Sequence, residues 1–349
     1  MRESLRPATA VRAIATSLAL SAAAFAVAQE PASLGFDVLL VSTLPSPQQQ
    51  DLAQALKDGL RERAHGELLE LQTFGDPAAL AAHLESKASE TKRPFAVVSV
   101  DAVAAQQWHE AAPREGAPPH FAVVANEDLL GSGHGEEGSL WWRLDTSTVV
   151  VETTPSAAPL VDFLRAEWGE DFPAVGFVFT HDFPPALTFQ DALEAAMPGM
   201  VHSATDGGEG RLMRCLLDPG ACRNLNDVKF ALRKELSAMA PGSLLVVYPD
   251  ANTTKFSFAF KQFAESHGYG LVSLGDFQTG GEVLEVKYDP SALSAAILES
   301  SRAYLETTPL EPLTFEKPAV AIRHDPEKWA SLARSSETTE PPKVSQTAN

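Results

Sequence analysis

The chain has 349 residues, with 46 acidic and 27 basic side chains and a net charge of −19. A surface of that charge repels nucleic acid and anionic membrane headgroups, so neither is an expected partner. The length is sufficient for one large domain or two medium ones.

The first 28 residues have the layout of a secretory signal peptide. Three arginines, at positions 2, 6 and 12, precede an apolar run from Ala13 to Val27, and small residues occupy Ala26 and Ala28. The alternative is a retained membrane anchor, but the run has about fifteen residues, whereas a membrane-spanning helix needs about twenty. We therefore expect cleavage after Ala28 and a periplasmic or secreted protein. The cut removes three arginines and one glutamate and leaves a charge of about −21.

Short apolar runs rich in valine alternate with amphipathic stretches along the first half of the chain. Asp101 is well placed to cap the third helix. Such a pattern is typical of a parallel sheet covered on both faces. The expected strands are 36–41, 68–74, 95–100, 121–125 and 148–151, and the expected helices are 47–63, 76–86 and 102–108.

A second series of the same kind follows. The final residues, 335–349, are too polar to build a core and are expected to be disordered. The expected strands are 174–180, 244–248, 270–274, 282–287 and 319–322, and the expected helices are 155–168, 185–196, 224–239, 253–266, 290–305 and a short helix around Trp329.

Two such series predict an α/β protein of two doubly wound parallel-sheet lobes hinged around a central cleft, because right-handed crossovers place helices on both faces of each sheet. Ligands of such sheets bind at the carboxyl ends of the strands, and ligand sites concentrate at domain boundaries. The expected division is a signal peptide at 1–28, a first lobe at 34–148 plus 282–334, a second lobe at 149–281, and a tail at 335–349.

Four segments, taken in order, resemble the ABC-transporter substrate-binding family with the type I periplasmic-binding-protein fold, the group that includes aromatic amino-acid binders. They are 38–60, 94–128, 243–311 and 319–332. Two motifs depart from the family: Val100-Asp101 stands where Gly-Thr is usual, and 146–149 reads TSTV where the family has NVTG.

The resemblance implies a monomeric, non-enzymatic protein that captures a small, amino-acid-like solute for an ABC permease. The alternative is an exported structural or regulatory protein that uses the same fold to contact a partner protein. The two departures and the adjacent Trp141 and Trp142 favour this alternative.

The candidate ligand contacts are polar and aromatic residues that follow the predicted strands, where the alternative role of each serine, threonine, aspartate or asparagine is to cap a helix. Asp182, Asp250 and Asp276 would make the cleft acidic and select a ligand with a positive group. The full set is Ser42, Thr43, Ser99, Asp101, Asn126 and Asp128 in the first lobe, Thr180, His181, Asp182, Phe183, Tyr248, Asp250 and Asn252 in the second, and Asp276, Phe277 and Gln278 at the crossover.

Motifs of catalysis are missing from the sequence. It contains no Walker A, H-E-x-x-H or G-x-S-x-G motif, and its nine histidines lack zinc-ligand spacing. The glycines at 133, 135 and 138 match G-x-G-x-x-G formally but lack the strand and helix that a dinucleotide site requires. We expect no enzyme activity, no cofactor and no metal site.

The two cysteines, Cys215 and Cys222, flank a turn signal at 218–220. In an oxidising compartment two cysteines so close around a turn are expected to form a disulfide, and the alternative is two free thiols.

Overall fold

The computed structural model describes residues 35–43, 47–64, 66–72, 93–112, 117–125, 145–169, 173–180, 183–196, 212–218, 220–275, 279–306 and 312–337, together with Leu80, Ala82, Ser86 and Leu130. The expected signal peptide and the predicted cut lie outside these residues.

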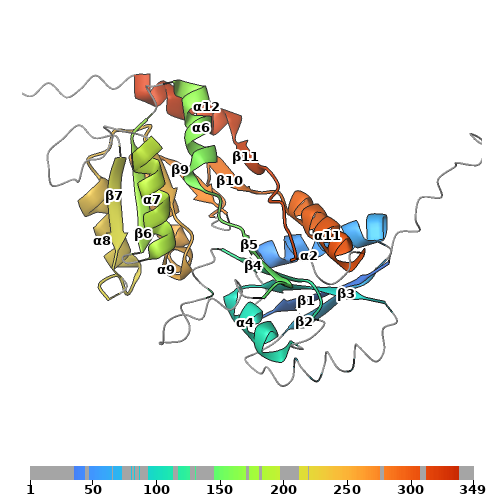
Figure 1. Ribbon diagram of the computed structural model, residues 1–349. Helices are drawn as coiled ribbons and strands as arrows, with labels where there is room; N and C mark the ends of the chain where they lie inside the picture. Colours follow the sequence, from blue (N-terminus) through green and yellow to red (C-terminus); the bar gives the residue numbers. More distant parts are fainter. Residues whose placement is uncertain are drawn as a thin grey trace, which may run out of the picture. The chain divides into compact units, whose positions relative to one another are not determined.

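The first sheet has five parallel strands in the order β2-β1-β3-β4-β5 (Figure 1). Its central strands are continuous apolar runs, as strands buried on both faces must be. Their side chains alternate: Val38 and Leu40 of β1 face one side, and Leu39 and Val41 face the other. The strands are β1 (Asp37–Ser42), β2 (Leu68–Gln72), β3 (Phe95–Val100), β4 (His120–Val124) and β5 (Thr148–Glu152).

Helices cover both faces of this sheet. α4 (Ala102–Ala111) packs Ala104 and Trp108 on one face. α2 (Pro47–Gly59), which continues into a π-helical turn η1 (Leu60–Ala64), packs on the other together with α11 (Pro290–Glu306). α2 and α11 approach closely at Gly59, where a Cβ would lie 2.7 Å from Leu298 Cδ1.

The second sheet has six strands in the order β11-β10-β9-β8-β6-β7, all parallel except the edge strand β11. They are β6 (Val175–Thr180), β7 (Leu212–Leu217), β8 (Leu244–Val247), β9 (Gly270–Leu274), β10 (Leu284–Tyr288) and β11 (Val320–His324).

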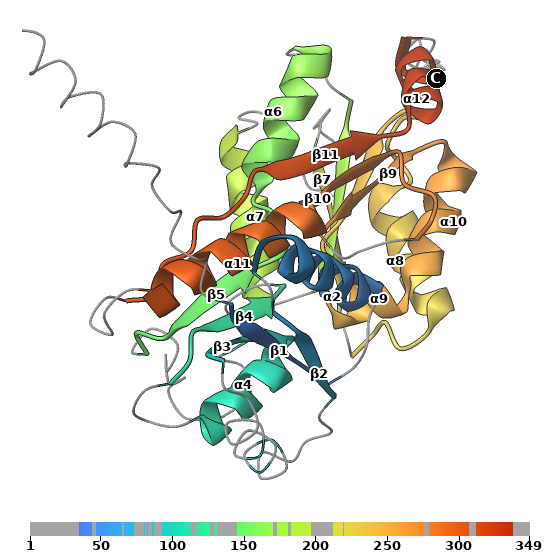
Figure 2. The same ribbon diagram turned by 90° about the vertical axis from the view of Figure 1, so that its right-hand side faces the viewer.

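Each face of the second sheet also carries helices, which Figure 2 shows from the side. One face packs α6 (Ala157–Trp168), α7 (Pro184–Ala196) and α12 (Pro326–Glu337) around Phe177 and Phe179. The other face packs α8 (Leu225–Leu236) and α10 (Ser257–His267), and a short helix α9 (Ala251–Lys255) precedes α10. No described helix combines the length and the apolar composition of a bilayer span.

The predicted fold class, two parallel-sheet α/β lobes, is confirmed. The strand β7 was missed, because Arg214 interrupts its apolar run. Arg214 is tolerated there since β7 is an edge strand, and its guanidinium donates to the carboxylate of Glu194 on α7.

The segment 282–334 was expected to belong to the first lobe, but the structure divides it between the two sheets. Its strands β10 and β11 pair with each other and β10 with β9, so both belong to the second sheet. α11 packs on the first sheet beside α2, where both views show it (Figures 1 and 2), and Leu313 and Phe315 join the same core. The expected boundary at 148/149 also differs, since β5 continues the first sheet to Glu152. α12 runs to Glu337, past the start of the expected disordered tail at 335.

The expected disulfide is absent: Cys215 and Cys222 are free thiols. Cys215 points from β7 into the apolar cluster under α8, and burial raises the pKa of its thiol far above the usual value. Cys222 lies after the turn at Asp218 and packs only against the rim of that cluster. The spacing around a turn indicated pairing, but the strand directs Cys215 into the core instead.

Candidate ligand-binding site

The chain passes between the two sheets three times. The first crossing follows β5, the second joins β10 to α11, and the third leads into β11. β10 runs parallel to β9, so its last residue, Tyr288, lies at the carboxyl edge of the second sheet. β11 begins at the same edge, because Val320 pairs with Tyr288. The second and third crossings therefore both occur at this edge.

The first crossing brings the carboxyl edges of the two sheets into contact. Thr153 N–H donates to the carbonyl of Val124, the last residue of β4, at 2.8 Å. Gly275 directly follows β9 with a φ of 55°, and a Cβ there would lie 3.2 Å from the Thr153 carbonyl oxygen and 3.3 Å from Thr154 Cα. Only glycine combines this backbone conformation with such an approach. Both carboxyl edges thus meet at Thr153.

The third crossing segment is tied to the first sheet as well. Lys317 Nζ donates to Glu152 Oε2 at 2.7 Å, and Glu152 is the last residue of β5. Leu313 N–H donates to the Thr146 carbonyl at 2.8 Å. Two crossing segments therefore run side by side at β5, and hinges are commonly formed by a few loop or element-terminal residues of this kind.

Thr43 and Asp101 lie at the carboxyl edge of the first sheet and bond to each other. Asp101 Oδ2 accepts from Thr43 N–H at 3.1 Å and from Thr43 Oγ1 at 2.7 Å, while Oδ1 accepts from Ala104 N–H at 2.8 Å. Asp101 is the predicted N-cap of α4, and this prediction is confirmed. Its φ of 88° is strained for a residue with a side chain, and such strain is often found at functional sites.

Asp250 occupies the corresponding edge of the second sheet. Its Oδ1 accepts from Thr253 N–H at 2.9 Å, and its own N–H donates to Thr253 Oγ1 at 2.8 Å. The carboxylate therefore starts α9; the residue as a whole is half-buried, and its Oδ2 is buried. Phe183, also half-buried, lies just before α7 and contacts the Tyr248 ring edge-on at 5.9 Å.

Two predicted contacts, Ser99 and Tyr248, are core residues. Ser99 has no exposed surface, and its Oγ lies 2.8 Å from His120 Nε2. Tyr248 is buried among Phe177, Phe183 and Phe189. Both follow the strand's alternation into the space under a helix, so neither is available to a ligand in this structure.

The remaining predicted residues divide into two groups. Ser42 is half-buried at the end of β1, Thr180 is buried at the end of β6, and Asn252 belongs to α9. The others lie outside the described residues: Asn126, Asp128, His181, Asp182, Asp276, Phe277 and Gln278.

Sequence reasoning missed the residues that join the sheets, Thr153, Gly275 and Lys317. It also missed Glu282, whose carboxylate accepts from the N–H groups of Thr279, Gly280 and Gly281. Burial opposes ionisation of Glu282, but these hydrogen bonds outweigh it and lower its pKa. The Gly280-Gly281 pair was the available signal, since it marks a turn that a neighbouring carboxylate can bind.

Comparisons with known proteins bear on the fold. No protein-family model matches the sequence, and no curated protein matches it. Among solved structures, an ABC domain in complex with L-Trp from Streptococcus pneumonia is 12% identical, with a TM-score of 0.53, and the match covers 86% of this chain and 95% of that one. An ABC transporter solute-binding protein from Conexibacter woesei is 15% identical, with a TM-score of 0.52 and coverage of 88% and 99%. The chain has the periplasmic-binding-protein fold.

A third match shows that this fold alone does not determine the ligand. A periplasmic ribose ABC transporter protein from Conexibacter woesei is 12% identical, with a TM-score of 0.50 and coverage of 88% of this chain and 96% of that one. Within the described part of this periplasmic-binding-protein fold, no three histidine, cysteine or carboxylate side chains are grouped as metal ligands.

Proposed function

We propose that this protein is an exported, monomeric, non-enzymatic solute-binding protein that captures a small molecule between the carboxyl edges of its two sheets. The observation that carries the proposal is the meeting of both edges at Thr153 and Gly275, with the other two crossings at the same edge. Ligands of open parallel sheets bind at such edges. The crossing segments join the two lobes, so the lobes can close on a solute by a hinge motion in these segments.

The proposed ligand is amino-acid-like. Asp250 is half-buried at the edge and suits a ligand ammonium, and the Thr43–Asp101 pair offers a second polar contact at the carboxyl edge of the first sheet. An L-Trp complex and a ribose transporter protein both have this fold, so the support for an amino acid comes from these carboxylates rather than from the fold.

Export and delivery complete the proposal. The N-terminal sequence supports cleavage after Ala28 and release into the periplasm or the medium. A membrane-embedded ABC permease would then receive the solute from the closed lobes.

A thermal-shift screen of the chain from Gln29 onward tests the binding of a solute. The probes are the amino acids, small peptides, nucleosides and pentose and hexose sugars. A solute at about a hundred times its dissociation constant adds about 2.7 kcal/mol of stability. Stabilisation by amino acids supports the full proposal, and stabilisation by sugars alone corrects the ligand class. No response from any class would contradict solute binding and favour the partner-contacting alternative.

The variant Asp250→Asn tests the ligand class. It keeps the side-chain oxygen that accepts from Thr253 and removes the charge. We expect at least about a tenfold loss of affinity for a cationic ligand, because a charge-assisted bond is lost. The matched control is Asp162→Asn, an exposed carboxylate on α6, which should bind normally. Equal affinities of the two variants would contradict the role of Asp250.

A further inference from the structure

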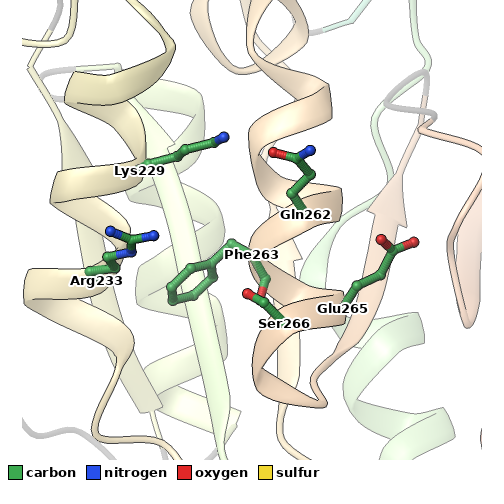
Figure 3. Close-up of a pocket in the computed structure, with 6 residues that line it drawn as sticks. All are labelled: Lys229, Arg233, Gln262, Phe263, Glu265 and Ser266. Carbon is green, nitrogen blue, oxygen red and sulfur yellow. The ribbon is translucent and has the colours of Figure 1, made fainter.

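Helices α8 and α10 lie side by side on one face of the second sheet, with a groove between them. Figure 3 shows Lys229 and Arg233 extending from α8 and Gln262 and Ser266 on α10. The ring of Phe263 lies between the helices at the base of a cavity of about 460 Å³. A second hollow of about 610 Å³ shares both cations. The second hollow is lined by α8 alone, so a ligand that fills both hollows would extend from the groove across α8.

Two cations, Lys229 and Arg233, line both hollows, although the chain is strongly acidic. α8 and α10 together contain four basic and three acidic side chains, so their surface lacks the excess of acidic groups that gives the chain its net charge of −19. Lys229 and Arg233 are one helical turn apart, and neither has an ion pair or hydrogen bond with the residues that the structure describes. Two acids also line the hollows: Asp227 accepts backbone N–H bonds at the start of α8, and Glu265 points away from α8 in Figure 3.

Two exposed aromatic side chains accompany these cations. Phe230 of α8 is 70% exposed and lines the second hollow, and Phe258 of α10 is 58% exposed. Phe258, Gln262 and Ser266 recur every four residues and so form one stripe along α10. A single exposed phenylalanine is ordinary, but aromatic residues beside arginine are typical of protein interfaces.

We propose that the α8–α10 groove, formed by Lys229, Phe230 and Arg233 of α8 and Phe258, Gln262 and Ser266 of α10, docks an acidic segment of a partner protein. Carboxylates spaced by about one helical turn pair with Lys229 and Arg233, and an apolar side chain of the partner covers Phe230. The acidic remainder of the surface repels the same segment, which confines docking to this groove. The proposal does not depend on solute binding, because neither its contacts nor its test involves a solute.

Fluorescence anisotropy with synthetic peptides tests this proposal on the chain from Gln29 onward. The probe is a labelled twelve-residue peptide with two Glu-Glu pairs flanking a phenylalanine, and its counterpart has Gln in place of Glu. We expect the Glu peptide to bind at least about tenfold more tightly than the Gln peptide. Lys229→Glu with Arg233→Glu should weaken binding of the Glu peptide by about tenfold or more, and Phe230→Ser by about threefold.

The matched control is the pair Lys57→Glu and Arg61→Glu on the first lobe, which changes net charge equally with the same spacing. It should leave binding nearly unchanged. Lys229→Gln alone provides a milder variant, and unfolding temperatures verify that each variant is folded. Equal weakening by the control pair would indicate a nonspecific charge effect and overturn the proposal, as would the absence of peptide binding.

Two further outcomes would replace the proposal. Inorganic phosphate is added at the same total charge concentration as the peptide. If it displaces the peptide, and if Phe230→Ser has no effect on peptide affinity, the groove is a small-anion site. The second outcome is that the protein fails to bind the peptide but sediments with phosphatidylglycerol vesicles. If Lys229→Glu with Arg233→Glu abolishes this sedimentation, the groove binds a membrane surface.

Discussion

The two sheets fill the space under their helices with different kinds of side chain. Beneath α4 the first sheet holds a chain of buried polar groups: Ser99 Oγ lies 2.8 Å from His120 Nε2, and His120 Nδ1 lies 3.1 Å from Thr148 Oγ1. Thr148 Oγ1 in turn donates to Asp145 Oδ2 at 2.7 Å. The second sheet holds aromatic rings instead, with Phe177 within 5.0 Å of Phe179 and stacked on Phe189 at 5.5 Å.

This difference has consequences for stability. A buried polar chain is favourable only while each member is paired and keeps its charge state, here a neutral His120 and an ionised Asp145, so the first sheet depends on pH. An aromatic core depends on volume and not on protons. Residues near strand ends, such as Ser99 and Tyr248, therefore act inside these two cores.

The largest expected effect is at the aromatic core. Phe177→Ala removes a fully buried ring that contacts Phe179, Phe189 and Tyr248. We expect a loss of about 3–5 kcal/mol in the free energy of unfolding by urea, because a cavity remains. Phe230→Ala, at an exposed site, should change stability by less than about 0.5 kcal/mol. A loss below about 1 kcal/mol for Phe177→Ala would break the contrast between the two cores.

The second prediction concerns pH. Burial lowers the pKa of His120 to about 3, although Asp145 opposes the shift and His109 adds to it. The unfolded chain binds the proton near pH 6.5, so the stability due to neutral His120 is complete above pH 6.5 and falls toward pH 3. We expect a loss of about 2 kcal/mol between pH 6.5 and 5, measured by urea unfolding.

His120→Gln should remove this slope, because glutamine does not titrate. His267→Gln on α10 of the second sheet is the control and should keep it, because His120 is untouched. Parallel pH profiles for wild-type and His120→Gln would show that the buried polar chain does not make the first sheet sensitive to pH.

The smallest expected effect is at Asp101, at the carboxyl edge of the first sheet. Asp101→Ala removes the α4 cap and the bonds to Thr43, and we expect a loss of about 1–2 kcal/mol. Asp101→Gly should cost about 1 kcal/mol less than alanine, because glycine accepts a φ of 88° without strain. Urea unfolding of both variants measures the difference, and equal losses would argue against backbone strain at Asp101.

The sequence was most informative where one physical rule acts alone. Continuous apolar runs such as β1, β3 and β8 predicted buried parallel strands, and Asp101 was correctly predicted as a cap. The prediction failed where a residue's role depends on its partner across the fold. Arg214 hid β7 because its ion pair with Glu194 spans twenty residues, and Ser99 was misplaced because His120 lies on another strand. Contacts such as Gly275 with Thr153 join segments far apart and leave no local pattern.

The central claim is that both carboxyl edges bind one solute, and hydrogen exchange tests it most directly. The measurement compares amide exchange with and without the solute that gives the largest thermal shift. The account predicts simultaneous protection at Thr43, at Thr153 and Thr154, and at Gly275, with α8 and α10 unchanged. Protection confined to one sheet, or located away from both carboxyl edges, would contradict it.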